Sequence, residues 1–317
     1  MGRAGLRIAA QIAALSAATL VICAAPIYAQ SSAESFAAKI RSELARGQLE
    51  AALRDAQLAV EDYPHSSLLF RLTGMALDRA GQSAGARSAL RRAIALDPGM
   101  PKNYFDLALV DLDANRYSDA AAEIKTFLAL EPNSAQAHLL LGRADEKLGD
   151  ASGAADQYKA AIVLAPQMPL VHYALGLAEE HEGKLEEALA AYEREIVYNP
   201  GFDGAYWHAG RIDREEGRLA QSEKFYKRAI HLNPDGFEGH YGLGVVLLSE
   251  HKPKEAIAQL NRAVAIRLTD VRAHQALAKA YHALEEFGDE QRELLIAEKL
   301  RETQATEPEK GNAGNGD

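Results

Sequence analysis

Four histidines recur at one spacing and are the residues that most readily suggest chemistry, because imidazole is a common metal ligand. His138 and His172 are 34 residues apart, as are His240 and His274. Ligands of one zinc ion must bring their nitrogens to about 2 Å from the metal, whereas packed helices lie about 8–10 Å apart. We therefore expect these histidines to fill packing positions, and we predict no metal site.

Motifs that would carry catalysis are missing from the sequence. There is no phosphate-binding loop, and the one GxSxG run, at residues 81–85, does not follow a predicted strand as a nucleophile elbow requires. His181 and Glu182 begin a run like HExxH, but Leu185 stands where the second histidine of a zinc protease is required. Acidic pairs such as Glu215 and Glu216 are numerous, and none stands in an apolar setting that would raise a carboxyl pKa. The sequence therefore predicts no catalytic residue, no cofactor and no enzyme activity.

Composition excludes several other classes. The 317 residues include 35 lysines and arginines against 45 acidic residues, a net charge of -10, which argues against a general nucleic-acid binder. A mean hydropathy of -0.23 and ordinary counts of 24 glycines and 11 prolines exclude collagen-like, wholly disordered and polytopic membrane chains. The single cysteine, Cys23, cannot form an intramolecular disulfide or hold a structural zinc alone.

The first 29 residues have the features of a secretory signal peptide. Arg3 and Arg7 precede an apolar run over residues 8–25, and the small residue Ala29 closes the segment. We predict cleavage after Ala29, a linker over 30–32, and a periplasmic or secreted mature protein.

Two alternatives would instead attach the protein to a membrane. The apolar run is at the lower limit for spanning a bilayer, so the segment could be retained as an anchor. Lipid attachment at Cys23 is the other, although bulky Ile22 precedes the cysteine where lipoprotein signals have a small residue. Without retention or lipidation, no membrane association is expected.

A period of 34 residues organises nearly all of the remaining chain. Prolines recur at this interval, at Pro64, Pro98, Pro132, Pro166, Pro200 and Pro234. Ten residues after each proline stands a small residue, in the series Gly74, Ala108, Gly142, Gly176, Gly210 and Gly244. Twelve residues further on, alanine or serine recurs, in the series Ala86, Ala120, Ala154, Ala188, Ser222 and Ala256. Such a period is typical of an array of stacked supersecondary units.

This pattern resembles the tetratricopeptide repeat, whose motif runs W-x2-L-G-x2-Y, then A-x3-F, then P. Eight units fit within residues 33–304, and they begin at residues 33, 67, 101, 135, 169, 203, 237 and 271. The resemblance implies an all-α fold, a right-handed superhelical solenoid of about eight helix-turn-helix repeats with the first helices lining its hollow. Residues 305–317 are polar and rich in glycine, and we predict that they form a disordered tail.

The recurring residue types have a physical reason in a helix hairpin. Small residues such as Gly142 and Ala154 let the two helix backbones approach closely, and Tyr158 fills the space beside that contact. Gly149 falls between the helices, where a positive φ ends the first one. The proline ends the second helix, because the residue before a proline disfavours the helical region.

One stripe of the first helices is predicted to face the hollow of the array. In the unit that begins at 203 this stripe includes Trp207, Arg211 and Arg214, and Tyr173 and Tyr241 take the place of Trp207 in the adjacent units. Tryptophan, tyrosine and arginine are enriched in binding hot spots. We predict that these five residues bind a protein or peptide partner. The alternative is that the aromatic side chains brace neighbouring helices.

These observations favour a non-enzymatic protein–protein interaction scaffold that binds its partner in the concave groove. The alternative function is an envelope-anchored structural or assembly factor that acts through oligomerisation.

Overall fold

The computed structural model describes residues 32–306. The predicted signal peptide with Cys23, linker residues 30 and 31, and residues 307–317 of the predicted tail lie outside the described residues. Ser32, expected in the linker, is the first residue of a helix, and residues 305 and 306 of the expected tail are helical because the last helix continues to Thr306.

The described part of the chain is all-α and contains no strand, as predicted. Its first helix covers residues 32–45 and pairs with α2 (Leu49–Asp62). The next are α3 (Ser67–Arg79), α4 (Ser83–Leu96), α5 (Pro101–Asp113), α6 (Tyr117–Leu130), α7 (Ala135–Lys147) and α8 (Ala151–Leu164). The last are α9 (Val171–His181), α10 (Leu185–Tyr198), α11 (Asp203–Glu215), α12 (Leu219–Leu232), α13 (Phe237–Ser249), α14 (Pro253–Ile266), α15 (Val271–His282) and α16 (Phe287–Thr306).

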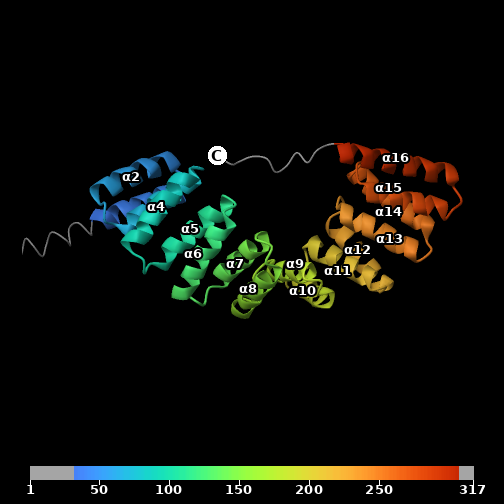
Figure 1. Ribbon diagram of the computed structural model, residues 1–317, viewed down its shortest axis with the longest axis horizontal. Coiled ribbons are helices and arrows are strands. Elements are labelled where there is room, and N and C mark those ends of the chain that lie inside the picture. Colours follow the sequence, from blue (N-terminus) through green and yellow to red (C-terminus); the bar gives the residue numbers. More distant parts are fainter. Residues whose placement is uncertain (1–31, 307–317) are drawn as a thin grey trace, which may run out of the picture. The chain divides into compact units, whose positions relative to one another are not determined.

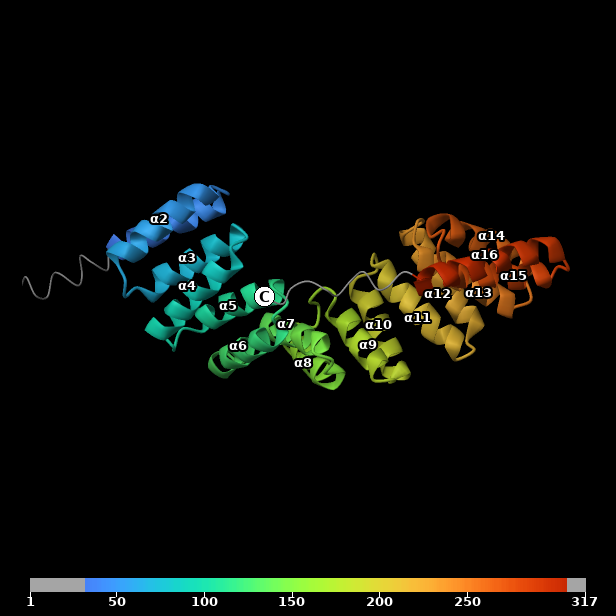
Figure 2. The same ribbon diagram turned by 45° about the horizontal axis from the view of Figure 1, so that its top comes forward.

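The helices form two compact units, divided between Leu164 and Ala165. Unit 1 contains the helices up to α8, and unit 2 contains α9 to α16. Within each unit, consecutive helices form antiparallel pairs and each pair packs on the next, as α4 does on α5 and α12 on α13 (Figures 1 and 2). First helices also contact each other, α3 with α5 in unit 1, and α11 with α13 and α13 with α15 in unit 2. The first helices of neighbouring pairs therefore lie side by side within each unit.

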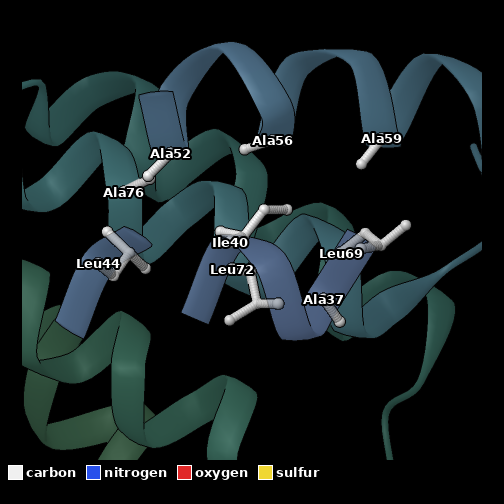
Figure 3. Packing of buried hydrophobic residues seen from close by; sticks show 9 residues of the cluster. All are labelled: Ala37, Ile40, Leu44, Ala52, Ala56, Ala59, Leu69, Leu72 and Ala76. Atoms are coloured by element: carbon white, nitrogen blue, oxygen red, sulfur yellow. The ribbon is translucent and has the colours of Figure 1, made fainter. Parts of the chain in front are cut away.

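Alanine supplies much of the helix–helix contact. In the first pairs of unit 1, Ala52 and Ala56 of α2 lie against Ile40, Leu69 and Leu72, and all five are at most 1 % exposed (Figure 3). Because an alanine side chain is a single methyl group, the helix axes can approach closely while the larger leucine and isoleucine side chains fill the space between them. This is the packing that the periodic small residues predicted.

Glycine occupies the places where even a methyl group would not fit. A Cβ atom built on Gly142 would lie 2.6 Å from Cε1 of Tyr158, and one on Gly176 would lie 2.6 Å from Cε1 of Tyr192. Both tyrosines are completely buried. The recurring glycine and the recurring tyrosine are therefore two halves of one contact.

The turn within each hairpin contains one residue with a positive φ, whatever its type. Glycine takes this conformation with φ between 72° and 83°, at Gly47, Gly81, Gly149, Gly183 and Gly217. Asn115, His251 and Glu285 occupy the same place in the 34-residue register, with φ between 57° and 61°. The hairpin geometry therefore imposes the left-handed conformation, and the residues with a Cβ atom bear a cost of about 1–2 kcal/mol there.

Helix α9 begins at Val171 and not at residue 169, where the register would start it. Leu170 precedes it with φ 63°, and no side chain of the preceding residues caps the helix. Instead the carboxylate of Glu195, from α10, accepts hydrogen bonds from the backbone N–H of Leu170 (3.1 Å) and of Tyr173 (3.3 Å). Glu195 is 1 % exposed, so these N–H groups are satisfied inside the fold and not by water.

Candidate partner-binding surface

The five residues predicted to bind a partner all lie on first helices of unit 2. Tyr173 is on α9, Trp207, Arg211 and Arg214 are on α11, and Tyr241 is on α13. Each side chain is partly exposed, as expected for a stripe at the edge of the core. The side chains differ, however, in how far their polar and aromatic groups are already occupied within the protein.

Tyr173 lies among other aromatic side chains. Its ring packs edge-on against Phe202, with centroids 4.8 Å apart, and lies 5.7 Å from the ring of Tyr192. Its hydroxyl oxygen is 3.2 Å from Nε2 of His208, on the next first helix. Tyr173 therefore joins α9 to α11, which is the bracing geometry that the sequence left open for these aromatics.

A carboxylate, Glu180, gathers donors from three neighbouring residues. It pairs with the guanidinium of Arg211, accepts a hydrogen bond from the Tyr192 hydroxyl at 3.0 Å, and lies 3.2 Å from Nδ1 of His208. Burial alone would raise the pKa of Glu180, but hydrogen bonds from His208 and Arg211 outweigh burial and hold this pKa at about 2. In the tautomer of His208 whose Nδ1 donates to this carboxylate, Nε2 accepts a hydrogen bond from the Tyr173 hydroxyl.

The two predicted arginines are engaged to different degrees. Arg211 pairs with Glu180 and also donates from Nη1 to Glu215 at 2.8 Å. The guanidinium of Arg214 comes only within 3.7 Å of the Glu215 carboxylate, which is too far for a hydrogen bond, and its side chain is 22 % exposed. Arg214 is therefore the arginine of this pair with donors left for a partner.

Trp207 lies beside a pocket. Its ring stacks on the ring of His208 and packs against the core around Tyr226. The pocket has a volume of about 250 Å³ and is lined by Trp207, Asp203, Ala229, Asn233, Gly236, Phe237, Glu238, Gly239 and Arg267. The indole thus forms part of the wall of a concave site that combines apolar, acidic and basic groups.

Tyr241 belongs to a stack of aromatic rings and arginines next to that pocket. The rings of Phe237 and Tyr241 are nearly parallel, with centroids 5.6 Å apart. The guanidinium carbon of Arg272 lies 5.1 Å from the Tyr241 ring centroid, and that of Arg267 lies 4.3 Å from the Phe237 ring centroid. Burial raises the pKa of the Tyr241 phenol, so its hydroxyl stays a neutral donor. Aromatic faces and cations therefore lie together around Tyr241.

Sequence reasoning missed Phe237, Arg267 and Arg272. Phe237 occupies the place of Asp203 in the preceding unit, so no periodic signal marks it. Arg267 directly follows the last residue of α14 and Arg272 is the second residue of α15, so neither shares a place in the 34-residue register with any of the five predicted residues.

Family models for the tetratricopeptide repeat match residues 38–101, 105–169 and 143–203, and a further model of the same repeat matches residues 213–280. The chain is a tetratricopeptide repeat protein. Its 34-residue period, its helix pairs and its Gly–Tyr contacts are the periodic features of this repeat.

Solved tetratricopeptide repeat structures resemble this protein over half to three quarters of its length. MamA is 28 % identical, with a TM-score of 0.50 over 51 % of this chain and 94 % of MamA. YrrB is 19 % identical, with a TM-score of 0.53 over 58 % of this chain and 95 % of YrrB. The C-terminal part of a repeat protein from Cytophaga hutchinsonii is 16 % identical, with a TM-score of 0.62 over 74 % of this chain and 96 % of that chain. No curated protein sequence matches the sequence of this protein.

The recurring histidines of this tetratricopeptide repeat protein each hydrogen-bond to their own hairpin's entry loop. Nε2 of His138, His172, His240 and His274 lies 2.9–3.3 Å from the carbonyl oxygen six residues earlier, at Pro132, Pro166, Pro234 and Leu268. Tyr104 and Tyr206 make the equivalent bond from their hydroxyls. This repeat position is therefore occupied by aromatic side chains whose polar atom hydrogen-bonds to the preceding loop. The observation agrees with the packing role expected from the sequence.

Within residues 32–306, no three histidine, cysteine, aspartate or glutamate side chains are grouped so that they could hold a metal ion. In the same part of the chain, no helix has both the length and the apolar character needed to cross a bilayer.

Proposed function

We propose that this protein is a non-enzymatic scaffold that binds a protein or peptide partner on the first helices of unit 2. Trp207, Arg214 and Tyr241 supply the direct contacts, and Tyr173 and Arg211 complete the stripe while holding α9 and α11 in register. The partner lies along the stripe and inserts a side chain into the pocket beside Trp207.

The observation that carries this proposal is the pocket of about 250 Å³ walled by Trp207 and Phe237. A half-buried tryptophan beside a concave space, with stacked rings and arginines at its rim, has the composition of a binding hot spot. Arg214 adds a cation with free donors, which suits a carboxylate or a backbone carbonyl of the partner.

Similar proteins support the general class of this function. The structure of YrrB is described as that of a TPR protein with an unusual peptide-binding site, and YrrB shares the fold of this chain. Arrays of this repeat bury one face of each hairpin in their neighbours and leave an extended surface of first helices for a partner.

We further propose that the protein is exported, to the periplasm or the cell exterior, with residues 1–29 as its signal peptide. The support is the sequence of that segment, with its two arginines, its apolar run and the small residue at position 29. The mass of the protein isolated from cells tests this: a chain that starts at Gln30 agrees, and a full-length or lipid-modified chain contradicts cleavage.

The binding site is tested with peptides selected from a random twelve-residue library on the immobilised wild-type protein. Trp207→Ala should weaken binding of the selected peptides by about 30-fold or more, since truncating a hot-spot residue costs about 2 kcal/mol or more. The helical circular dichroism should be unchanged, because Trp207 is only partly buried.

Two control variants separate this surface from general effects of truncation. Phe287→Ala removes a 54 % exposed aromatic side chain at the start of α16, and Lys184→Ala removes an exposed charge in the α9–α10 turn. Neither should change peptide binding. Equal affinity of the Trp207→Ala and wild-type proteins for every selected peptide would refute the site, and loss of helical signal in Trp207→Ala would mean that Trp207 is a core residue.

A further inference from the structure

Unit 1 has two adjoining pockets on its own first helices, and none of their lining residues belongs to the proposed site. One, of about 190 Å³, lies between α3 and α5, and the other, of about 310 Å³, lies between α5 and α7. Leu109 of α5 lines both pockets and forms the wall between them. Leu109 occupies the place in the 34-residue register that Arg211 holds in α11, so both pockets adjoin the unit 1 equivalent of a stripe position.

The first pocket is acidic. Its lining includes the carboxylates of Asp78 and Asp106. Asp106 is paired with Arg71 at 3.1 Å, whereas Asp78 has no ion-pair partner among the described residues although it is half-buried. Arg79 also lines the pocket, but its Nη1 donates to the Leu44 carbonyl oxygen at 2.8 Å, in the preceding hairpin.

Asp78 carries a carboxylate without an ion pair among the described residues. Burial raises the pKa of Asp78, the negative charge of Asp113 raises it further, and the positive charge of Arg79 offsets only part of this rise. A partly desolvated carboxylate without an ion pair is unfavourable, and an ammonium or guanidinium group placed beside it reduces that cost. The chemistry of this pocket therefore favours a basic side chain.

The second pocket is basic at its rim and apolar at its floor. Arg143 and Lys147 are one turn apart on α7, both are exposed, and neither has an ion pair among the described residues. The floor is formed by Leu109, Leu112 and Leu140. Asp113 also lines this pocket and leaves it a net charge of +1. Two free cations over a leucine floor favour an acidic side chain that follows an aliphatic one.

We propose that the first helices of unit 1 form a second polypeptide-binding site, which takes an extended segment carrying a basic and an acidic residue on either side of an aliphatic one. The basic side chain enters the pocket of Asp78. The aliphatic side chain lies over Leu109 and Leu112, and the acidic side chain lies between Arg143 and Lys147.

The spacing of the two pockets sets the spacing of the charges in the partner. The pockets are one hairpin apart, and packed helices lie about 8–10 Å from each other. An extended peptide advances about 3.3 Å per residue, so the basic and acidic residues should be about three positions apart. This charge pattern differs from the aromatic and arginine surface of unit 2, so the inference extends the proposed function to a second ligand class.

The test uses three terminally blocked, fluorescently labelled peptides that share Gly-Ser flanks. Two contain Lys-Ala-Leu-Asp and Asp-Ala-Leu-Lys, which present the charges in the two chain directions, and the third contains the neutral Gln-Ala-Leu-Asn. Fluorescence anisotropy with the wild-type protein should show one charged order binding at least about tenfold more tightly than the neutral peptide, which corresponds to about 1.4 kcal/mol.

Charge-reversal variants assign the binding to the two pockets. Arg143→Glu combined with Lys147→Glu should remove the preference, and it should bind a Lys-Ala-Leu-Lys peptide more tightly than the wild-type protein does. Asp78→Asn should weaken the charged peptide toward the affinity of the neutral one. The matched control Lys125→Glu reverses an exposed charge on α6 outside both pockets and should leave all affinities unchanged.

The outcome also separates this inference from the proposed function of unit 2. Trp207→Ala should not alter binding of these peptides, and if it abolishes the preference, the peptides bind at unit 2 and the unit 1 site is refuted. Equal affinity of all three peptides, or an undiminished preference in the double charge reversal, overturns the proposal as well. Melting curves of each variant verify that the fold is intact.

Discussion

The close contact between Gly176 and Tyr192 leads to a stability prediction that can be worked from the structure. A Cβ atom at residue 176 would lie 2.6, 2.8 and 2.9 Å from three carbon atoms of the Tyr192 ring, whereas carbon atoms in van der Waals contact are about 3.5–4.0 Å apart. Tyr192 is completely buried, and its hydroxyl donates to Glu180 at 3.0 Å. The ring can therefore move only by disturbing the core and this hydrogen bond.

Gly176→Leu should lower the free energy of unfolding by about 3 kcal/mol. Overpacking of a core costs about 1–3 kcal/mol, and leucine demands more space than the Cβ alone, so the upper end applies. Loss of the Tyr192–Glu180 hydrogen bond adds about 1 kcal/mol, and the better helix propensity of leucine offsets about 0.8 kcal/mol. For a cooperative unit of this size, the midpoint of thermal unfolding should fall by about 6–12 °C.

The matched control is Gly288→Leu, in α16 of the same unit. A Cβ atom at residue 288 meets nothing within 4 Å. Thermal melts followed by circular dichroism should therefore show no loss of stability for Gly288→Leu and a clear loss for Gly176→Leu. If both variants melt within about 1 °C of the wild-type protein, the close approach does not exist and the assignment of Gly176 to the helix contact is wrong.

Three further predictions concern the turns, the buried cap and the carboxylate network. Glu195→Ala should cost about 1–3 kcal/mol, because it leaves partly buried backbone N–H groups at the start of α9 without their acceptor, and hydrogen exchange should speed up at Leu170 and the following residues. The pKa of Glu180 is lowered from 4.5 to about 2, so its ionised form stabilises the fold above about pH 4.5 and that contribution is lost as the pH falls toward 2. Urea titrations should therefore show that lowering the pH from about 4.5 toward 2 reduces the free energy of unfolding less in Glu180→Gln than in the wild-type protein. His251→Gly should raise the unfolding free energy by up to about 1 kcal/mol, because it relieves a left-handed conformation, whereas His251→Ala should bring no such gain.

The periodic features of the fold could be predicted from the sequence because they arise from contacts that each hairpin repeats. Gly142 and Tyr158 belong to one such contact, and each position in the 34-residue register has the same neighbours in every interior hairpin. The exceptions are informative. Asn115, His251 and Glu285 take the left-handed turn conformation without being glycine, because the packed helices on both sides leave the turn no other path.

The sequence by itself determined the all-α fold, the repeat family and the stripe of first-helix residues, since these follow from residue type and period alone. Only the tertiary structure decided which of those residues keep hydrogen-bond donors that no other residue in the described part of the chain occupies. Glu180, on the preceding first helix, occupies the guanidinium of Arg211 and leaves the donors of Arg214 available. The hollows beside Trp207 and Leu109 likewise depend on side chains brought together from neighbouring hairpins. Free donors and hollows are set by distances between residues some thirty positions apart, and no local pattern encodes those distances.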